Sequence, residues 1–357
     1  MPINYYYCRL YFIVMNICFI MYPWERIDPK VDSSLRMIHE AVSRGYKVGI
    51  VTPQNLTIRE NITYAFCKMI TVKEKISTSP AVFYKQVKFK EQMLPLGGFD
   101  AIFMRDNPPI DNNMLNFLDS VKEDTFIVNS VEGLREANNK IYTAALSSDT
   151  MDITPATHVS KNKEYLKRVI KESKTGKMIL KPLNGFGGRG VILIERSAMS
   201  SVSSLLDFYI DGEGDRSNYV ILQEFVEGAE KGDVRILMLN GEPIGAMKRV
   251  PADGDNRSNV HAGGTVQKHV LTKEEKLLCK KIGPKLVANG LYFVGLDVIS
   301  NKLIEVNVCS PGGITRINKL NRVKLQQNIM DFVETVVESK NSRLSRKSQL
   351  KKHINEI

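Results

Sequence analysis

The sequence predicts a mixed α/β and α+β protein, with a doubly wound parallel-sheet domain at the N-terminus and a region of antiparallel strands after it. Between residues 15 and 137, short β-branched runs alternate with amphipathic stretches, which is typical of βαβ units. From residue 178 onward, apolar runs are joined by turns that contain glycine or asparagine, which favours hairpins. No Gly-x-Gly-x-x-Gly sequence follows the first strand, so a dinucleotide-binding fold is not indicated.

The N-terminal domain is predicted to cover residues 15–137. Asp32, followed by Ser33 and Ser34, offers an N-cap for the first helix, and Gly45 ends that helix. We expect strands at 16–21, 46–52, 99–104 and 125–129 and helices at 35–43 and 112–122.

Residues 1–14 are predicted to be an extension before this domain. They are rich in Tyr and Ile, but Arg9 interrupts the apolar run, and neither a basic leading segment nor a small-residue cleavage site is present. A signal peptide or a membrane span is therefore not indicated. Translation that begins at Met15 is a further expectation, which N-terminal mass spectrometry would test.

The remaining chain is predicted to form short strands with three helices. A glycine-rich loop at 184–190 separates two of these strands, which indicates an antiparallel hairpin. We expect strands at 178–183, 191–195, 220–225, 235–239, 243–250, 292–299 and 303–308, and helices at 164–174, 273–289 and 323–339.

The last of these hairpins carries three oxygen ligands, Asp297, Glu305 and Asn307. Side chains alternate along a strand, so Glu305 and Asn307 share a face, and a three-residue loop at 300–302 would place Asp297 opposite Glu305. Two carboxylates and an amide are hard donors that suit Mg²⁺ when it also carries phosphates. The alternative is a solvated pair of acids on a polar sheet face.

A second group of residues fits a phosphate. Lys181 ends an apolar strand before the glycine-rich loop, whose backbone N–H groups can approach phosphate oxygens closely, and Arg189 adds charge. The segment 223–226 leaves a strand and is typical of a hinge whose backbone can bind an adenine edge. Lys140 is a candidate second phosphate contact, and the alternative for it is a solvated helix lysine.

These motifs together resemble the ATP-grasp ligases, and more narrowly the bacterial glutathione synthetases. The resemblance covers roughly residues 15–335 in the same order. It rests on Asp32-Ser33-Ser34, Met104-Arg105-Asp-Asn-Pro-Pro109, Lys140, Lys181-Pro-Leu-Asn-Gly-Phe-Gly-Gly, Gln223-Glu-Phe, Gly232-Asp-Val-Arg235, Arg249-Val-Pro, Arg257-Ser-Asn-Val-His-Ala-Gly-Gly264, Phe293-Val-Gly-Leu-Asp297 and Glu305-Val-Asn307.

The resemblance implies a two-subdomain ATP-grasp fold after the N-terminal domain. We expect a small subdomain at 138–225 and a C-terminal subdomain at 226–339 that clasp ATP between antiparallel sheets. Residues 251–265 contain three glycines and no apolar periodicity, so we expect a lid that is mobile when the site is empty, and the alternative is a plain surface loop. Residues 340–357 are a basic tail.

The resemblance also implies a role for each site residue. Asp297, Glu305 and Asn307 would hold Mg²⁺ or Mn²⁺, in two ions, and the arginines Arg235, Arg249 and Arg257 would act on carboxylate and phosphoryl oxygens. The ATP-binding residues would be Lys140, Lys181, Asn184, Gly185, Gly187, Gly188, Gln223, Glu224, Phe225, Val226 and Asp233. The substrate-binding residues would be Asp32, Ser33, Arg105, Ser310, Pro311, Gly312 and Gly313.

The implied reaction joins γ-glutamylcysteine to glycine with ATP, through an acyl phosphate, in a homo-oligomeric enzyme. Two features differ from the family pattern: Gly312-Gly313 follows Ser-Pro where a Thr and another small residue are expected, and Asp106 follows Arg105 where a basic residue is common. Another ATP-grasp carboxylate–amine ligase therefore stays open, and so does a non-catalytic ATP-binding module.

The composition agrees with a nucleotide-binding protein of the cytoplasm. The formal net charge is +11, and six Lys or Arg residues lie between Lys340 and Lys352, in a segment that we expect to be solvated and poorly ordered rather than a nucleic-acid or membrane site. The five cysteines are scattered without a Cys-x-x-Cys pair, and the five histidines are dispersed. This indicates a reducing compartment and no zinc site.

Overall fold

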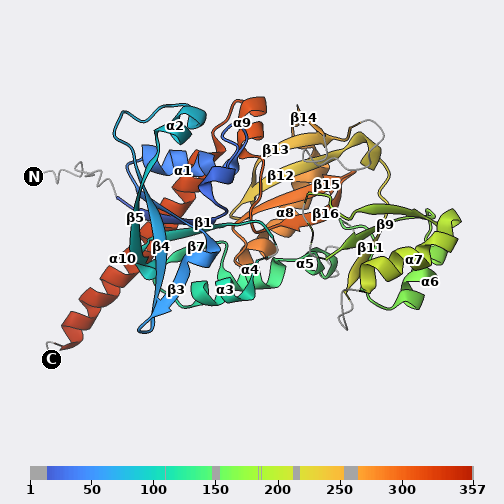
Figure 1. Cartoon of the computed structure of the whole chain (residues 1–357), viewed down its shortest axis with the longest axis horizontal. Helices are drawn as coiled ribbons and strands as arrows, with labels where there is room; N and C mark the ends of the chain where they lie inside the picture. Colours follow the sequence, from blue (N-terminus) through green and yellow to red (C-terminus); the bar gives the residue numbers. More distant parts are fainter. Residues whose placement is uncertain are drawn as a thin grey trace, which may run out of the picture.

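A computed structural model describes residues 14–108, 110–146, 153–183, 185, 187–211, 218–252 and 264–355. The predicted extension lies outside the described residues up to position 13. Figure 1 shows the N-terminal domain on the left, the last sheet of the chain above the middle and a smaller sheet with two helices on the right.

The N-terminal domain is built on a seven-stranded sheet. Its strands are β1 (Asn16–Met21), β2 (Lys47–Val51), β3 (Leu56–Arg59), β4 (Ile62–Thr71), β5 (Lys88–Pro95), β6 (Ala101–Arg105) and β7 (Phe126–Val128). Its helices are α1 (Ser33–Ser43), α2 (Pro80–Gln86), α3 (Asn112–Asp119) and α4 (Val131–Ala137). The strand order is β3-β4-β2-β1-β6-β7, and β5 pairs with β4.

The predicted parallel, doubly wound arrangement is confirmed for the centre of this sheet. Strands β1, β2, β6 and β7 pair in parallel. Ile17 and Phe19 belong to the core with α1, whereas Cys18 and Ile20 belong to the core with α3 and α4, as a period of two requires. The sheet as a whole is mixed, because the antiparallel strands β3, β4 and β5 extend one edge.

Two antiparallel sheets follow, as the resemblance predicts. The smaller has the order β10-β9-β11-β8, and the larger has the order β14-β13-β12-β15-β16. Their strands are β8 (Thr157–Ser160), β9 (Lys177–Pro182), β10 (Ile192–Glu195), β11 (Val220–Glu224), β12 (Asp233–Leu239), β13 (Glu242–Val250), β14 (Thr265–Lys268), β15 (Phe293–Ile299) and β16 (Lys302–Asn307). Their helices are α5 (Ile141–Ala144), α6 (Lys163–Glu172), α7 (Met199–Ile210), α8 (Lys273–Ala288) and α9 (Ile314–Asn321).

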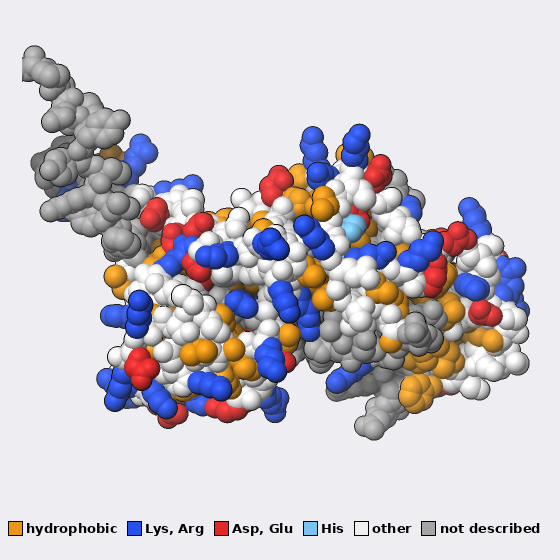
Figure 2. Space-filling model, turned by 90° about the horizontal axis from the view of Figure 1, so that it is seen from above, with side chains coloured by type: hydrophobic (Ala, Val, Ile, Leu, Met, Phe, Trp, Pro, Cys, Tyr) orange, Lys and Arg blue, Asp and Glu red, His pale blue; other side chains and the backbone are white. Residues whose placement is uncertain are grey.

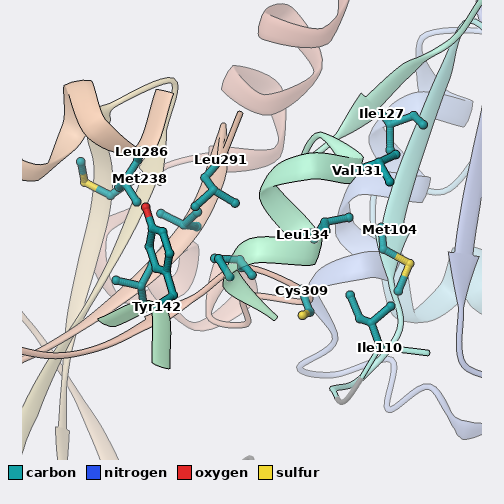
Figure 3. Close-up of a cluster of buried hydrophobic side chains, with 14 of the residues drawn as sticks. Met104, Ile110, Ile127, Val131, Leu134, Tyr142, Met238, Leu286, Leu291 and Cys309 are labelled. Carbon is teal, nitrogen blue, oxygen red and sulfur yellow. The ribbon is translucent and has the colours of Figure 1, made fainter. Parts of the chain in front are cut away.

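One hydrophobic core connects the N-terminal domain to the larger antiparallel sheet. Figure 3 shows Met104 and Leu134 on one side of it and Met238 and Leu291 on the other. Buried Asn129 reinforces the junction, because its side chain donates to the carbonyl oxygens of Phe293 (2.9 Å) and Val308 (2.8 Å) and accepts from the Phe293 N–H (2.6 Å). Asn129 thus fixes the start of β15 and the end of β16 on the N-terminal domain.

The C-terminal helix returns to the N-terminal domain. Helix α10 (Leu325–Asn355) packs against α1 and β7 through its first half and then leaves the body of the protein (Figure 1). The expected poorly ordered tail is therefore helical up to residue 355. Lysine and arginine side chains also cover much of the face in Figure 2, so the tail is not the only basic region. Within the described residues, no helix is both long and apolar enough to cross a bilayer.

Candidate active site

Two adjoining cavities lie between the antiparallel sheets. The first, of about 320 Å³, is lined mainly by β9, β10, the exit of β11 and the β15–β16 hairpin. The second, of about 200 Å³, extends toward the N-terminal domain and the segment 308–316. Seven residues line both cavities and form their common wall: Lys140, Gly185, Gly187, Arg235, Arg249, Glu305 and Asn307.

The β15–β16 hairpin has the predicted pairing of Asp297 with Glu305 but reaches it differently. The turn contains two residues, Ser300 and Asn301, with φ angles of +45° and +64°, instead of the three expected. A register shift after Asp297 leaves one extra residue on β16. Turn and bulge together count like a three-residue loop, so the two carboxylates still face each other.

Charged side chains form a row across one face of the larger sheet. Asp233 and Arg235 are two residues apart on β12, so they share a face. In the strand register, Asp233 pairs with Arg249 of β13, and Arg235 pairs with Asp297 of β15. The order of charges across the strands therefore follows from the sequence spacing once the register is set.

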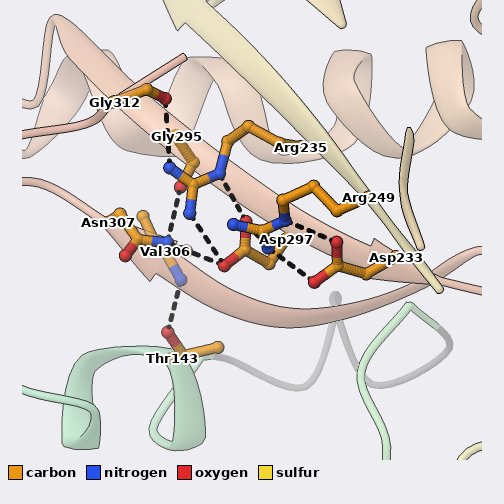
Figure 4. A network of polar contacts seen from close by, with 9 residues as sticks. All are labelled: Thr143, Asp233, Arg235, Arg249, Gly295, Asp297, Val306, Asn307 and Gly312. Carbon is orange, nitrogen blue, oxygen red and sulfur yellow. Dashed lines mark hydrogen bonds and ion pairs between the residues drawn. The ribbon is translucent and has the colours of Figure 1, made fainter. Parts of the chain in front are cut away.

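The row is held by two arginine–carboxylate forks, which Figure 4 shows. Arg235 contacts Asp297 at 2.6 and 3.0 Å, and Arg249 contacts Asp233 at 2.6 and 2.5 Å. Arg249 also lies 3.0 Å from Asp297. Burial alone would raise the pKa of Asp297, but Arg235 and Arg249 lower it to about 2. Its stabilising contribution is thus complete above pH 3.8 and is lost as the pH falls toward 2.

The three predicted metal ligands lie side by side. Asn307 donates from Nδ2 to Asp297 Oδ2 at 3.2 Å, and Glu305 forms an ion pair with Lys140 at 3.2 Å. In the described ranges, no group of three or more His, Cys, Asp or Glu side chains is placed to hold a metal ion by itself. Two carboxylates and an amide nevertheless fit Mg²⁺, which keeps several waters and takes further oxygens from phosphate.

Both predicted phosphate lysines reach the first cavity. Lys181 is buried and donates to Gln223 Oε1 at 3.0 Å, and burial lowers its pKa to about 8. Lys140 donates to the carbonyl oxygen of Gly185 in the glycine-rich loop. The first cavity is therefore lined by two lysines, Lys181 from β9 and Lys140 from the start of α5.

The far end of the first cavity is apolar. Ile179 and Leu193 come from the smaller sheet, and Ile299 and Ile304 come from the hairpin of the larger sheet. Glu224, Phe225 and Val226, at and after the end of β11, line the same cavity. Apolar walls of this kind suit a flat heteroaromatic ring.

All predicted ATP and metal residues that the structure describes line the first cavity together. These are Lys140, Lys181, Gly185, Gly187, Gly188, Gln223, Glu224, Phe225, Val226, Asp233, Asp297, Glu305 and Asn307, with Arg235 and Arg249. Asn184 and Arg257 lie outside the described residues, as does most of the predicted lid, at 253–263.

The predicted substrate residues divide into two groups. Ser310, Gly312 and Gly313 line the second cavity. Pro311, Asp32, Ser33 and Arg105 do not line it. Pro311 belongs to the segment 310–313, and Asp32, Ser33 and Arg105 form hydrogen bonds with the backbone of this segment and of Ile314 or at the start of α1.

The second group supports the cavity from below. Ser33 Oγ accepts from the N–H groups of Gly313 (3.1 Å) and Ile314 (3.2 Å). Buried Arg105 donates to Ser34 Oγ (3.0 Å) and to the carbonyl oxygen of Pro311 (3.2 Å). Asp32 caps α1 by accepting from the Leu35 N–H at 2.7 Å.

Sequence reasoning gave no role to several residues of the site, among them Arg316, Asn107 and Thr143. Arg316 and Asn107 line the second cavity. Thr143 accepts a hydrogen bond from the Val306 N–H at 3.1 Å and so holds β16 on α5. Arg316 stands three residues after the Ser-Pro-Gly-Gly segment, and this proximity was the available signal. Nothing in the sequence around Thr143 indicates its contact.

Comparisons with known proteins agree with this geometry. Residues 15–135 match the family model "Prokaryotic glutathione synthetase, N-terminal domain", and residues 139–322 match "Prokaryotic glutathione synthetase, ATP-grasp domain". The glutathione synthetase of Thermosynechococcus vestitus is 34% identical over 327 residues, which is 89% of this chain and 99% of that protein. The glutathione synthetase of Agrobacterium fabrum is 33% identical over 324 residues, 90% and 97% of the two chains.

Among solved structures, the ATP-grasp ligase PsnB, complexed with minimal precursor, Mg and ADP, has a TM-score of 0.57 at 14% identity and covers 90% of this chain and 98% of its own. This likeness concerns the fold. Together with the two family matches, it confirms the predicted ATP-grasp fold. The chain belongs to the prokaryotic glutathione synthetase family of ATP-grasp ligases.

Proposed function

We propose that this protein joins γ-glutamylcysteine to glycine and forms glutathione, while ATP is converted to ADP and phosphate. The observation that carries the proposal is the common wall of the two cavities, where metal ligands, a lysine and two arginines meet. ATP would occupy the first cavity, with its base against the apolar end and its phosphates toward this wall. The acid and the amine would occupy the second.

The chemistry has two steps. A carboxylate oxygen of γ-glutamylcysteine attacks the γ-phosphorus of ATP, the bond from that phosphorus to the bridging oxygen breaks, and ADP leaves. The glycine nitrogen then attacks the carbonyl carbon of the acyl phosphate, the bond from that carbon to the phosphate oxygen breaks, and phosphate leaves as the nitrogen loses a proton. No protein nucleophile is required.

The protein's task is to overcome the repulsion between a carboxylate and a triphosphate. Lys140 and Lys181 would bind phosphate oxygens, and Arg235 and Arg249 would orient the oxygens that exchange the phosphoryl group. Asp297, Glu305 and Asn307 would hold Mg²⁺ or Mn²⁺, in two ions, which would neutralise phosphate charge. The arginine forks keep Asp297 ionised, as a metal ligand must be.

The remaining site residues would hold the substrates and close the site. Asn184 would lie against the phosphates, and Arg257, within a lid at 251–265, would close over the acyl phosphate and protect it from water. Ser310, Gly312 and Gly313 would contact the substrates, with Asp32, Ser33, Arg105 and Pro311 behind them. We also propose a homo-oligomer that works in the cytoplasm, and the free, buried thiols of Cys18 and Cys279 agree with a reducing compartment.

One observation favours a second candidate, a ligase of the same class with another acid or amine. The two glycines at 312 and 313 line the second cavity and depart from the expected family pattern. A non-catalytic ATP-binding module has no such support, because the metal ligands and both lysines line one site.

The test is product formation with a panel of acids and amines, followed by mass spectrometry and ADP release. We expect glutathione from γ-glutamylcysteine, glycine and ATP, with Mg²⁺ required. Turnover only with other pairs would select the second candidate. Nucleotide binding without turnover of any pair would show that the protein is not a ligase.

A further inference from the structure

The second cavity contains an arginine to which the proposed reaction has not yet given a role. Arg316 is the third residue of α9 and follows the segment 310–313. Its half-buried side chain lines the second cavity and does not line the first. It therefore faces the space in which the acid and the amine would meet, away from the nucleotide.

Arg316 differs from the other cations of this cavity in its partners. Lys140 is paired with Glu305, Arg235 with Asp297, and Arg249 with Asp233 and Asp297. Over the ranges that the structure describes, no carboxylate lies within salt-bridge distance of the Arg316 guanidinium. Asp28 attracts it from farther away, while burial and the nearby Arg249 lower its pKa.

Partial burial removes water from a guanidinium, and without a carboxylate beside it this loss of hydration is not compensated. Its planar fork of N–H groups matches a carboxylate bidentately. The cavity also has room beside it, because a Cβ atom added at Gly312 would meet nothing within 4 Å. Space and an unpaired fork thus occur together in the substrate cavity.

We propose that Arg316 binds a substrate carboxylate that does not react, in the first place the carboxylate of the amine substrate. The carboxylate that takes the phosphoryl group must lie at the common wall, next to the metal ligands. Arg316 lies beyond this wall, where the far end of an incoming amino acid would extend. The inference rests on the proposed function and adds the residue that would make the enzyme select an amino acid over a simple amine.

A second source of the same chemistry is the α-carboxylate of the γ-glutamyl group. The two sources are distinguished by steady-state kinetics of the full-length enzyme, with Arg316→Gln and Arg316→Lys beside wild type. Glycine is compared with glycinamide, which keeps the amine and lacks the charge. Lys319→Gln is the matched control, because it removes one positive charge from an exposed position on the same helix.

For Arg316→Gln we expect a rise of roughly 10- to 100-fold in KM for glycine, a much smaller change in kcat, and an unchanged KM for ATP. The wild-type preference for glycine over glycinamide should fall by a similar factor. Arg316→Lys should recover part of the loss, since it keeps the charge without the fork. Lys319→Gln should behave as wild type.

A rise confined to the KM of γ-glutamylcysteine would assign Arg316 to the γ-glutamyl carboxylate and keep the carboxylate-binding role. Unchanged KM values for both substrates in folded Arg316→Gln and Arg316→Lys would overturn the inference. Absence of glutathione from the wild-type enzyme would instead contradict the proposed function. The same comparison of acid and amide, run with the pair that the enzyme does use, would then still decide whether Arg316 binds a carboxylate.

Discussion

The site residues of the larger antiparallel sheet and those of the N-terminal domain contribute in different ways. Asp297, Glu305 and Asn307 lie on one face of a sheet and line a cavity. Ser33 and Arg105, which the family resemblance places at the substrate, lie under the cavity floor and bind backbone atoms of the segment 310–314. The larger antiparallel sheet supplies charged side chains to the cavity, and the N-terminal domain holds the segment 310–314 in place.

The difference shows how burial decides what a charged residue can do. The acids and arginines of the sheet alternate in sign across strands, so each keeps a partner while staying at the cavity. Arg105 is only 3% exposed and satisfies two carbonyl or hydroxyl oxygens of its surroundings. A motif therefore locates a residue near a site without telling whether its side chain reaches the ligand.

The largest effects should come from replacing the two carboxylates of the β15–β16 hairpin. The two variants should both lose activity but should differ in stability. Glu305→Gln should lower turnover by at least about 100-fold, because it removes a proposed metal ligand. The melting temperature should stay close to wild type, since Glu305 is partly exposed and the variant loses only its ion pair with Lys140. Asp297→Asn should also abolish turnover. It should in addition cost about 3–5 kcal/mol of unfolding free energy, because buried Arg235 loses its carboxylate partner and Arg249 loses one of its two.

Thermal and urea unfolding beside ADP-release assays check both variants. Equal stability of Asp297→Asn and wild type would contradict the structural role of the arginine forks. Activity of Glu305→Gln with an unchanged dependence on Mg²⁺ would remove Glu305 from the metal ligands.

An intermediate effect is expected from the buried lysine. Because burial lowers the pKa of Lys181 to about 8, its proton should be lost as the pH rises through this range, and ATP affinity should fall with it. Lys181→Arg, which stays protonated, should remove this step from the profile of ATP binding against pH. Lys177→Arg, on an exposed position of the same strand, is the control and should keep the wild-type profile.

ATP affinity that stays flat between pH 7 and 9.5 in the wild type would show that Lys181 is not titrating there. The first cavity would then hold its phosphates by other groups, and the contrast between the two regions would weaken.

The smallest effects should come from the N-terminal residues. Arg105→Gln should cost about 1–3 kcal/mol of unfolding free energy through lost hydrogen bonds and should change substrate KM values only a few-fold. Ser34→Ala removes one partner of Arg105 and should show the same pattern at about 1 kcal/mol.

The buried Nη1 atom of Arg105, which has no hydrogen-bond partner among the described residues, makes this test informative. If Arg105→Gln raised the KM for γ-glutamylcysteine more than tenfold at unchanged stability, Arg105 would contact substrate, and the distinction between the two regions would fail.

Much of the site could be predicted because strand periodicity fixes which side chains share a face. The pairing of Asp297 with Glu305 followed from spacing alone, although the turn has two residues and a bulge supplies the third. Ser300, Asn301 and Lys302 are turn-forming or polar residues that suit either loop, so the sequence could not distinguish the two solutions.

Contacts between distant segments could not be predicted in this way. In β3, β4 and β5, large apolar residues such as Ile58, Phe66 and Met93 also occupy exposed positions, so the sequence does not alternate between polar and apolar residues there. The pairing of these strands extends an edge of the sheet. The hydrogen bonds of Ser33 with Gly313 and Ile314 join residues about 280 positions apart, and no local pattern encodes such a contact. The helical tail was missed because charge alone does not tell a solvated helix from a disordered segment.

The most direct test of the central claim, that two sheets form one cationic, metal-dependent site for a triphosphate, is calorimetric titration of ATP with and without Mg²⁺. We expect one ATP per chain with Mg²⁺, and a loss of affinity of at least tenfold when Mg²⁺ is withheld or Glu305 is replaced by Gln. Equal ATP affinity under all three conditions, or no binding with Mg²⁺ present, would contradict the account.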